Sequence, residues 1–280
     1  MVTRRAFLGG VGATSLGVAG AVAVLGDGAA SSDEKPNALV AGSLLYVADE
    51  VSAGPVEAHG SAAVRRLILD GLRHPDAVAL ADPRLFEGVA DRGSLFATNA
   101  LVLAYAPDSA AASTLERGLT AVADPALAVG RTDPDVDPLG YRTVMALRLA
   151  ASAFDVDARA VLDESYVVPE TDLMNALENG GIDAAFAYRN MAVQRNLPFV
   201  PLPDRIDFSN PDFADAYAEA AYELDGQTVR GAPIRYAATA LTDFGSGWVD
   251  RLVTARTRLR EAGFVVPDAY PRRHVPVGRR

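Results

Sequence analysis

Two serines stand directly after a glycine where an apolar segment gives way to an apparent helix. Ser43 follows Gly42 at the end of the apolar run 38–41, and Ser61 follows Gly60 before an amphipathic segment. The first turn of a helix offers unpaired backbone N–H groups and the positive end of the helix dipole, and glycine lets a ligand approach closely. Two such corners facing each other would hold a tetrahedral oxyanion. The plainer alternative is that each serine only caps its helix.

Two carboxylates also stand where a strand is expected to meet a helix. Asp137 lies in the segment Asp135-Val-Asp-Pro-Leu-Gly-Tyr-Arg142, and Glu170 follows Pro169. Both are common cap residues at such positions. A carboxylate is an unexpected neighbour for an anion because like charges repel. It becomes favourable only if its oxygen binds a hard, highly charged metal atom at the centre of the ligand.

Tyr188 ends the apolar run 184–188, where its hydroxyl could donate to an anion, although a half-buried strand tyrosine is the commoner case. Arg142 and Arg189 could set the charge of such a site or could simply be surface cations. The sequence holds no nucleophile elbow, zinc-protease motif, P-loop or dinucleotide fingerprint. The absence of these motifs lowers the expectation of an enzyme.

The composition excludes several classes of protein. The chain has 280 residues and a formal net charge of −10, so it lacks the basic footprint that nucleic acid requires. It has no cysteine, which excludes disulfides, thiolate zinc sites, cysteine nucleophiles and a lipid-bearing anchor. The three histidines, at positions 59, 74 and 274, lack metal-ligand spacing.

The first residues are typical of an export signal. Arg4 and Arg5 precede Phe7 and Leu8, and an uncharged run rich in glycine and alanine extends over residues 6–25. We predict a twin-arginine signal peptide over residues 1–30 and a polar linker over 31–36. The alternative is a retained membrane anchor, which its many glycines make weak as a helix. The protein is therefore expected outside the cytoplasm, extracellular, at the cell surface or associated with the membrane.

Short apolar runs alternate with helical patterns along the rest of the chain. The runs 38–41, 77–81 and 184–188 read as buried strands, and 62–72 and 141–154 read as helices. This alternation predicts an α/β fold with parallel sheets covered by helices on both faces. Ligands of such sheets bind beyond the carboxyl ends of the strands, where the glycine-serine corners and both carboxylates are expected.

The chain resembles the tungstate/molybdate-binding proteins of ABC importers, the archaeal WtpA/ModA type. The similarity extends from about Leu39 to Tyr236 and follows the order of the family's motifs. The matching stretches are Ala41-Gly-Ser-Leu44, Gly60-Ser-Ala-Ala-Val-Arg-Arg66, Phe96-Ala-Thr-Asn-Ala-Leu101, Asp137-Pro-Leu-Gly-Tyr-Arg142, Pro169-Glu-Thr-Asp-Leu173, Gly181-Ile-Asp-Ala-Ala-Phe-Ala-Tyr-Arg189, Met191-Ala-Val-Gln194 and Leu202-Pro-Asp-Arg-Ile206.

The resemblance implies a two-lobed periplasmic-binding-protein fold of type II, with the ligand between the lobes. Lobe one would comprise residues 37–105 and 206–280, and lobe two residues 106–205. The chain would then cross between the lobes near Tyr105 and near Leu202-Pro203, and closure would be a hinge motion.

The resemblance also implies the function and the roles of the site residues. The protein would be the substrate-binding component of an ABC transporter, capturing tungstate or molybdate for import. Ser43 and Ser61 would bind the oxyanion, Asp137 and Glu170 would complete a six-coordinate tungsten or molybdenum, and Tyr188 would match the family's ligand tyrosine. We expect no catalysis, no cofactor besides the ligand and a monomer, with the importer's permease and ATPase as partners.

Two alternatives remain open from the sequence. The same fold could bind a purely tetrahedral anion such as sulfate, or the chain could be an exported hydrolase that uses Asp137 and Glu170 as an acid–base pair. The segments between Ser43 and Ser61 and between Arg142 and Pro169 are shorter than in archaeal members of the family. The sequence leaves open which metal is preferred, the affinity and whether the leader is cleaved.

Overall fold

The computed structural model describes residues 35–107, 112–115, 119–154 and 156–278. The predicted leader and all but the last two residues of the predicted linker lie outside these ranges. In the part that is described, no helix combines the length and the apolar character that crossing a membrane would need.

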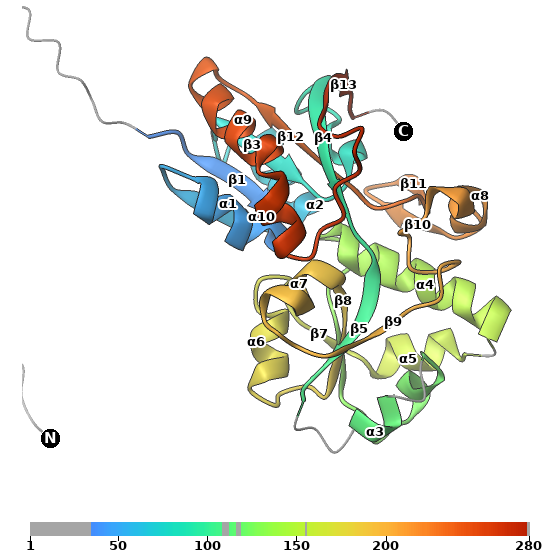
Figure 1. The fold of residues 1–280 in the computed structure, drawn as a ribbon. Coiled ribbons are helices and arrows are strands. Elements are labelled where there is room, and N and C mark those ends of the chain that lie inside the picture. The colour runs from blue at the N-terminus through green and yellow to red at the C-terminus, as the bar shows by residue number, and fades with distance from the viewer. Residues whose placement is uncertain (1–34, 108–111, 116–118, 155, 279–280) are drawn as a thin grey trace, which may run out of the picture. The chain divides into compact units, whose positions relative to one another are not determined.

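The first lobe is built on a six-stranded sheet in the order β13-β4-β12-β3-β1-β2 (Figure 1). Strand β1 runs parallel to β2 and β3, whereas β12 is antiparallel to β3 and β4, and β13 is antiparallel to β4. Its strands are β1 Ala38–Ala41, β2 Val56–His59, β3 Ala77–Leu80, β4 Arg92–Thr98, β12 Arg235–Ala240 and β13 Arg272–Pro276. Its helices are α1 Leu45–Val51, α2 Ser61–Leu69, α9 Ser246–Thr254 and α10 Arg256–Glu261, with short 3-10 turns at Gly42–Leu44, Pro83–Phe86 and Asp243–Gly245.

The second lobe is built on a five-stranded sheet in the order β7-β6-β8-β5-β9. Its strands are β5 Leu101–Tyr105, β6 Val129–Arg131, β7 Tyr166–Val167, β8 Ala184–Tyr188 and β9 Phe199–Pro201. Its helices are α3 Ala112–Leu115, α4 Pro138–Phe154, α5 Ala158–Glu164, α6 Leu173–Glu178 and α7 Arg189–Gln194, with a 3-10 turn at Leu119–Ala123. A 3-10 turn Pro211–Phe213, helix α8 Ala214–Tyr217 and the hairpin of β10 Ala221–Leu224 with β11 Gln227–Arg230 follow β9.

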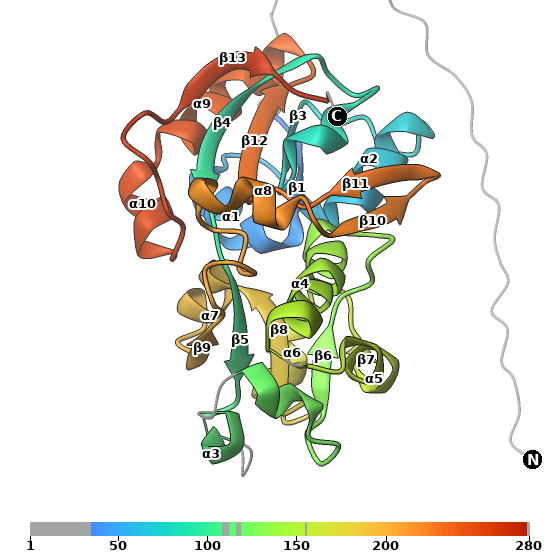
Figure 2. The ribbon, with the colours of Figure 1, turned by 90° about the vertical axis from the view of Figure 1, so that its right-hand side faces the viewer.

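The chain first passes between the sheets at Asn99-Ala100. Figures 1 and 2 show β4 of the first sheet continuing directly into β5 of the second. We expected this crossing near Tyr105, but β5 pairs with β8 from Leu101 to Tyr105 and so belongs to the second sheet. The pattern misled because apolar residues run through both strands. The return crossing follows β9, close to the expected Leu202-Pro203.

The buried strands agree closely with the apolar runs. Residues 38–41 and 184–188 form β1 and β8 with every residue buried, and each fully buried valine or leucine contributes about 1.5–3 kcal/mol. Two expectations need correction. The sheets are mixed rather than parallel, and helix α2 ends at Leu69, so Leu72 is 61% exposed instead of facing the core. The positive φ of Gly71 explains the early end of this helix.

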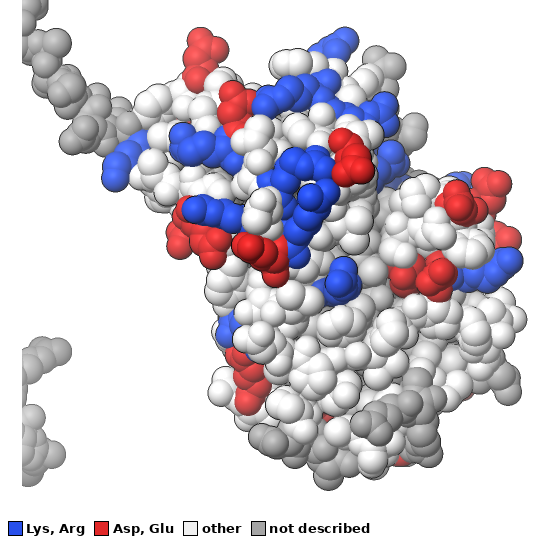
Figure 3. Space-filling model, viewed as in Figure 1, with Lys and Arg blue, Asp and Glu red and all other residues white. Residues whose placement is uncertain are grey.

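Charge is distributed unevenly over the molecule. Residues 251–280 contain eight arginines and only two acidic residues, although the whole chain carries a net charge of −10. Figure 3 shows basic side chains gathered over α9, α10 and β13. The remainder of the chain is therefore even more acidic than the total suggests, and a cation near the ligand must come from a particular buried residue rather than from the general surface.

Candidate functional site

The structure brings the five predicted site residues together where the two lobes meet. Ser43 follows β1 and Ser61 begins α2 on the first lobe, while Asp137 precedes α4, Glu170 follows β7 and Tyr188 ends β8 on the second. All five are buried, and Glu170 is the most accessible at 4%. Buried serines and carboxylates at strand ends need partners, and these partners define the site.

The corner at Gly42-Ser43 holds the carboxylate of Glu170. The backbone N–H of Gly42 donates to its Oε2 at 3.2 Å, and that of Ser43 donates to its Oε1 at 3.1 Å. A Cβ on Gly42 would lie 2.9 Å from Oε2 of Glu170, so glycine is needed for this approach. The backbone N–H groups of the corner that we predicted to bind the oxyanion therefore hold a carboxyl group of the opposite lobe.

The corner at Gly60-Ser61 lies against the loop that carries Asp137. A Cβ on Gly60 would lie 2.5 Å from the carbonyl oxygen of Val136 and 2.6 Å from Cβ of Asp137. The backbone N–H of Ala63 donates to that carbonyl at 3.0 Å. The hydroxyl oxygen of Ser61 accepts from the backbone N–H of Ala81 at 3.1 Å, which leaves the hydroxyl hydrogen to be donated to a ligand.

Asp137 accepts hydrogen bonds from the described residues through only one of its two carboxylate oxygens. Oδ1 accepts from the Thr132 hydroxyl and from the backbone N–H of Gly140, both at 2.8 Å. Oδ2 is buried and has no hydrogen-bond partner among the described residues. An unpartnered buried oxygen is costly, so its retention here points to a ligand atom that it binds.

Burial perturbs both carboxyl groups. Loss of solvent raises the pKa of Asp137 to about 7, against the hydrogen bonds from Gly140 and Thr132. Loss of solvent and then the charge of Asp137 raise the pKa of Glu170 to about 8. The effect of Asp137 on Glu170 shows that the two groups are close enough to repel each other when both are ionised.

A buried cation faces this pair from α4. Arg142 is 2% exposed and donates through Nη1 to the Tyr188 hydroxyl at 2.7 Å and to the Ala81 carbonyl at 3.0 Å. Its Nη2 reaches Oδ2 of Asp82 on the first lobe at 3.2 Å. Of the two interpretations open for Arg142, the surface cation is therefore wrong. Arg189 donates only weakly to the carbonyl of Gly263, at 3.5 Å, away from the carboxylates.

The two carboxylates lack a third protein ligand for a bare metal ion in the part of the chain that is described. In the ranges that the structure describes, no group of three or more histidine, cysteine, aspartate or glutamate side chains is placed to bind one. Two carboxylate oxygens suit a metal that arrives with most of its coordination already filled by its own oxygens. The arrangement thus fits a metal-centred oxyanion.

Comparison with known proteins identifies the family. Residues 54–265 match the model described as bacterial extracellular solute-binding protein. The chain belongs to this family. As a solute-binding protein, it has a transport role.

Two relatives of this solute-binding protein have named ligands. A Haloferax volcanii protein, named provisionally as an ABC transporter molybdenum-binding protein, is 44% identical, with 96% of this chain and 93% of that protein covered. The molybdate/tungstate-binding protein WtpA of Thermococcus kodakarensis is 31% identical, with 67% of this chain and 63% of that protein covered.

Solved structures confirm the predicted type II fold of this solute-binding protein. The periplasmic molybdate-binding protein of Azotobacter vinelandii superposes with a TM-score of 0.57 at 14% identity, covering 84% of this chain and 100% of that one. The sulfate-binding protein SubI of Mycobacterium tuberculosis superposes with a TM-score of 0.51 at 14% identity, covering 83% and 87%. At such identities the likeness shows the fold alone, and it does not choose between these ligands.

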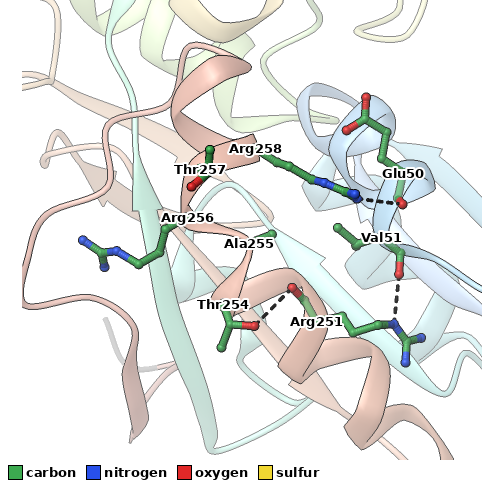
Figure 4. A pocket seen from close by; sticks show the side chains of 8 residues that line it. All are labelled: Glu50, Val51, Arg251, Thr254, Ala255, Arg256, Thr257 and Arg258. Atoms are coloured by element: carbon green, nitrogen blue, oxygen red, sulfur yellow. Dashed lines mark hydrogen bonds between the residues drawn. The ribbon is translucent and has the colours of Figure 1, made fainter.

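Another hollow of this solute-binding protein lies away from the carboxylates, between α1 and α9–α10 (Figure 4). Arg251 donates to the carbonyl of Val51 at 2.9 Å, and Arg258 donates to that of Glu50 at 3.1 Å. Both carbonyls belong to the last turn of α1, where they lack helical partners. Helix capping explains these arginines, so we do not assign the hollow to the solute.

Sequence reasoning missed three polar residues of this solute-binding protein that surround Ser43. Asn190 donates to the Ser43 carbonyl at 2.7 Å, and the hydroxyls of Tyr236 and Ser43 lie 3.2 Å apart. Asn99 donates to both Asn190 and Tyr236. Asn99 lies inside a quoted family motif and Asn190 lies between two of them. Tyr236 comes from β12, 193 residues after Ser43, and no local pattern marks it.

Proposed function

We propose that this solute-binding protein captures tungstate or molybdate for an ABC importer. The observation that carries the proposal is the pair of buried carboxylates, with Oδ2 of Asp137 left without a hydrogen-bond partner among the described residues. The two glycine-serine corners lie on the opposite lobe from these carboxylates. An oxyanion whose metal atom can take further ligands suits both groups, because its oxygens accept from the glycine-serine corners while its metal binds the carboxylate oxygens.

The carboxylates favour such a centre over sulfate. Sulfur in sulfate takes no further ligands, so Asp137 and Glu170 would repel the anion in their ionised forms. Tungsten or molybdenum can accept one oxygen from each carboxylate and reach six-coordination, which converts the repulsion into bonding. The names of the Haloferax and Thermococcus relatives support the same choice.

Each residue has a distinct role in the proposal. Ser43 and Ser61 donate hydroxyl and backbone hydrogen bonds to the oxo groups, and Asp137 and Glu170 bind the metal. Tyr188 accepts from Arg142, which leaves its own hydroxyl hydrogen to be donated to an oxo group. Arg142 supplies the buried positive charge that offsets the anion and the two carboxylates.

The proposal extends to export and assembly. The twin-arginine signature at Arg4-Arg5 supports export of the folded protein by that route. The solute would be delivered to a permease and its ATPase, and the protein would act as a monomer without a resident cofactor or catalysis. The transporter name of the Haloferax relative supports this role, and it leaves the hydrolase alternative without comparable support.

Calorimetric titration of the purified protein with tungstate, molybdate and sulfate tests the proposal. We expect one-to-one binding of the first two anions and no binding of sulfate. Replacing both carboxylates, Asp137→Ala with Glu170→Ala, should weaken tungstate binding by about 100-fold or more, since each metal bond is lost. Undiminished tungstate binding in that variant, or sulfate binding equal to tungstate in the parent, would contradict the six-coordinate site.

A further inference from the structure

The amide of Asn99 has a fixed orientation at the crossing between β4 and β5. Its Oδ1 accepts from the backbone N–H of Ala100 at 3.0 Å, so Nδ2 faces the other way. From there Nδ2 donates to Oδ1 of Asn190 at 2.7 Å and to the Tyr236 hydroxyl at 3.2 Å. The Asn190 amide is fixed as well, because its Nδ2 donates to the carbonyl of Ser43 at 2.7 Å, and a carbonyl can only accept.

These orientations favour one direction for the next hydrogen bond, in which Tyr236 donates to Ser43. The Tyr236 oxygen accepts from Asn99, so its own hydrogen is available for the Ser43 oxygen, 3.2 Å away. Burial raises the pKa of Tyr236, which keeps this hydroxyl protonated. Ser43 then accepts from Tyr236 and has its own hydrogen left to donate.

We propose that Asn99 and Tyr236 are positioning residues that hold the Ser43 hydroxyl as a donor toward the bound oxyanion. This inference rests on the proposed function, since it assigns the donor that the cargo meets. The chain of hydrogen bonds Asn99–Tyr236–Ser43 also strengthens its last member, because each bond polarises the next in a buried setting.

This chain of hydrogen bonds, the Asn99–Tyr236–Ser43 relay, links the site to the crossing between the lobes. Asn99 lies between the two sheets, Tyr236 belongs to the first lobe, and Asn190 reaches Ser43 from the second. The bond from Asn190 to the Ser43 carbonyl therefore joins the two lobes directly beside the donor that meets the cargo.

A fixed donor also bears on which anions are accepted. Tungstate and molybdate are fully ionised near neutral pH and offer only acceptors, which suits a hydroxyl held as a donor. The relay therefore presents these anions with a hydroxyl hydrogen that any of their oxygens can accept.

A double-mutant cycle tests the relay. Tyr236→Phe removes only the hydroxyl and keeps the ring. The centroid of this ring lies 5.2 Å from that of Phe264 and 6.1 Å from that of Tyr188. Tungstate affinity is measured by calorimetry in the parent, Tyr236→Phe, Ser43→Ala and the double variant. We expect Tyr236→Phe to weaken binding about tenfold in the parent and to have almost no effect in the Ser43→Ala background. Equal losses in both backgrounds, or no loss in the parent, would overturn the relay.

Tyr217→Phe is the matched control. Tyr217 is equally buried, and its hydroxyl donates to the backbone carbonyl of Asp204, apart from the relay. We expect this variant to bind tungstate as the parent does, even if its melting temperature falls. Weakened binding in the control equal to that of Tyr236→Phe would attribute the loss to general destabilisation and would overturn the relay.

Failure of the proposed function would be visible separately. A parent that binds neither tungstate nor molybdate contradicts the proposed cargo, and the relay is then judged on the unloaded protein. There the Tyr236 and Ser43 hydroxyls remain hydrogen-bonded, so the losses of stability in Tyr236→Phe, Ser43→Ala and the double variant, measured by urea unfolding, should not be additive. Additive losses would overturn the relay independently of the cargo.

Discussion

Asp82 and Asp137 are both buried aspartates where the lobes meet, but their surroundings are opposite. Asp82 is bonded by Arg84, Arg142 and the Tyr141 hydroxyl, the last at 2.7 Å. Burial alone would raise its pKa, but the two arginines hold it well below its ordinary value. Asp137 has no cation bonded to it among the described residues, and its pKa rises to about 7. The fully bonded carboxylate of Asp82 stabilises the protein. Oδ2 of Asp137 lacks a hydrogen-bond partner among the described residues, and under the proposed function it binds the ligand.

The largest effect on stability is expected at Asp82, whose carboxylate is fully bonded. Asp82→Asn removes a buried charge that faces Arg84 and Arg142, and breaking a buried pair in this way costs about 3–5 kcal/mol. Urea unfolding should show this loss. The control is Asp225→Asn, which breaks the exposed pair with Arg66 and should cost less than about 1 kcal/mol. Similar losses in both variants would remove the distinction between the two aspartates.

Asp137 should respond in the opposite way, with unchanged or higher stability and weaker tungstate binding. Asp137→Asn keeps the shape of the side chain but removes a charge that burial disfavours, so the free energy of unfolding of the unloaded protein should rise or stay unchanged. Tungstate affinity should fall by about 100-fold, because the amide is a poor ligand for the metal. Calorimetry and thermal melting measure the two quantities, and Asp133→Asn controls for the loss of a nearby charge. A destabilised variant with intact binding would make Asp137 structural.

The pH dependence of stability should separate the two regions further. Asp137 and Glu170 have raised pKa values of about 7 and about 8, so the stability that their protonated forms contribute is complete below about pH 4 and is lost as pH rises through 7 to 8. The pKa of Asp82 is lowered, so its contribution is present above about pH 4 and is lost in acid.

The melting temperature of the unloaded protein should therefore fall by on the order of 5 °C between pH 5 and 8. The double variant Asp137→Asn with Glu170→Gln should show a flatter profile over this range, while its loss of stability below pH 4 persists. If the melting temperature of the double variant fell between pH 5 and 8 as steeply as that of the parent, groups other than Asp137 and Glu170 would govern this pH dependence.

The same contrast explains what the sequence could predict. Gly42-Ser43, Gly60-Ser61 and the aspartate of the Asp-Pro turn were found because a strand end followed by a cap is a local pattern. Their family roles came from resemblance. Asp82 was recognised only as the end of a strand, since its partner Arg142 lies 60 residues away and on the other lobe. Tyr236 was missed for the same reason. Local patterns place a side chain at a corner, but only the tertiary fold decides whether another residue saturates it.

Tyr188 offers the finest test because Arg142 joins the two regions through it. The Arg142 guanidinium donates to both the Tyr188 hydroxyl and Asp82. One cation therefore contacts the proposed ligand site and the fully bonded aspartate. Tyr188→Phe removes the hydroxyl and leaves the bond to Asp82, so stability should fall by only about 1 kcal/mol. Tungstate affinity should fall about tenfold, because the cargo loses a donor. The measurements are again calorimetry and urea unfolding, with Tyr217→Phe as the control. A loss of stability as large as that of Asp82→Asn would show that the two regions are one network, in which Tyr188 supports the Asp82–Arg142 pair rather than the cargo.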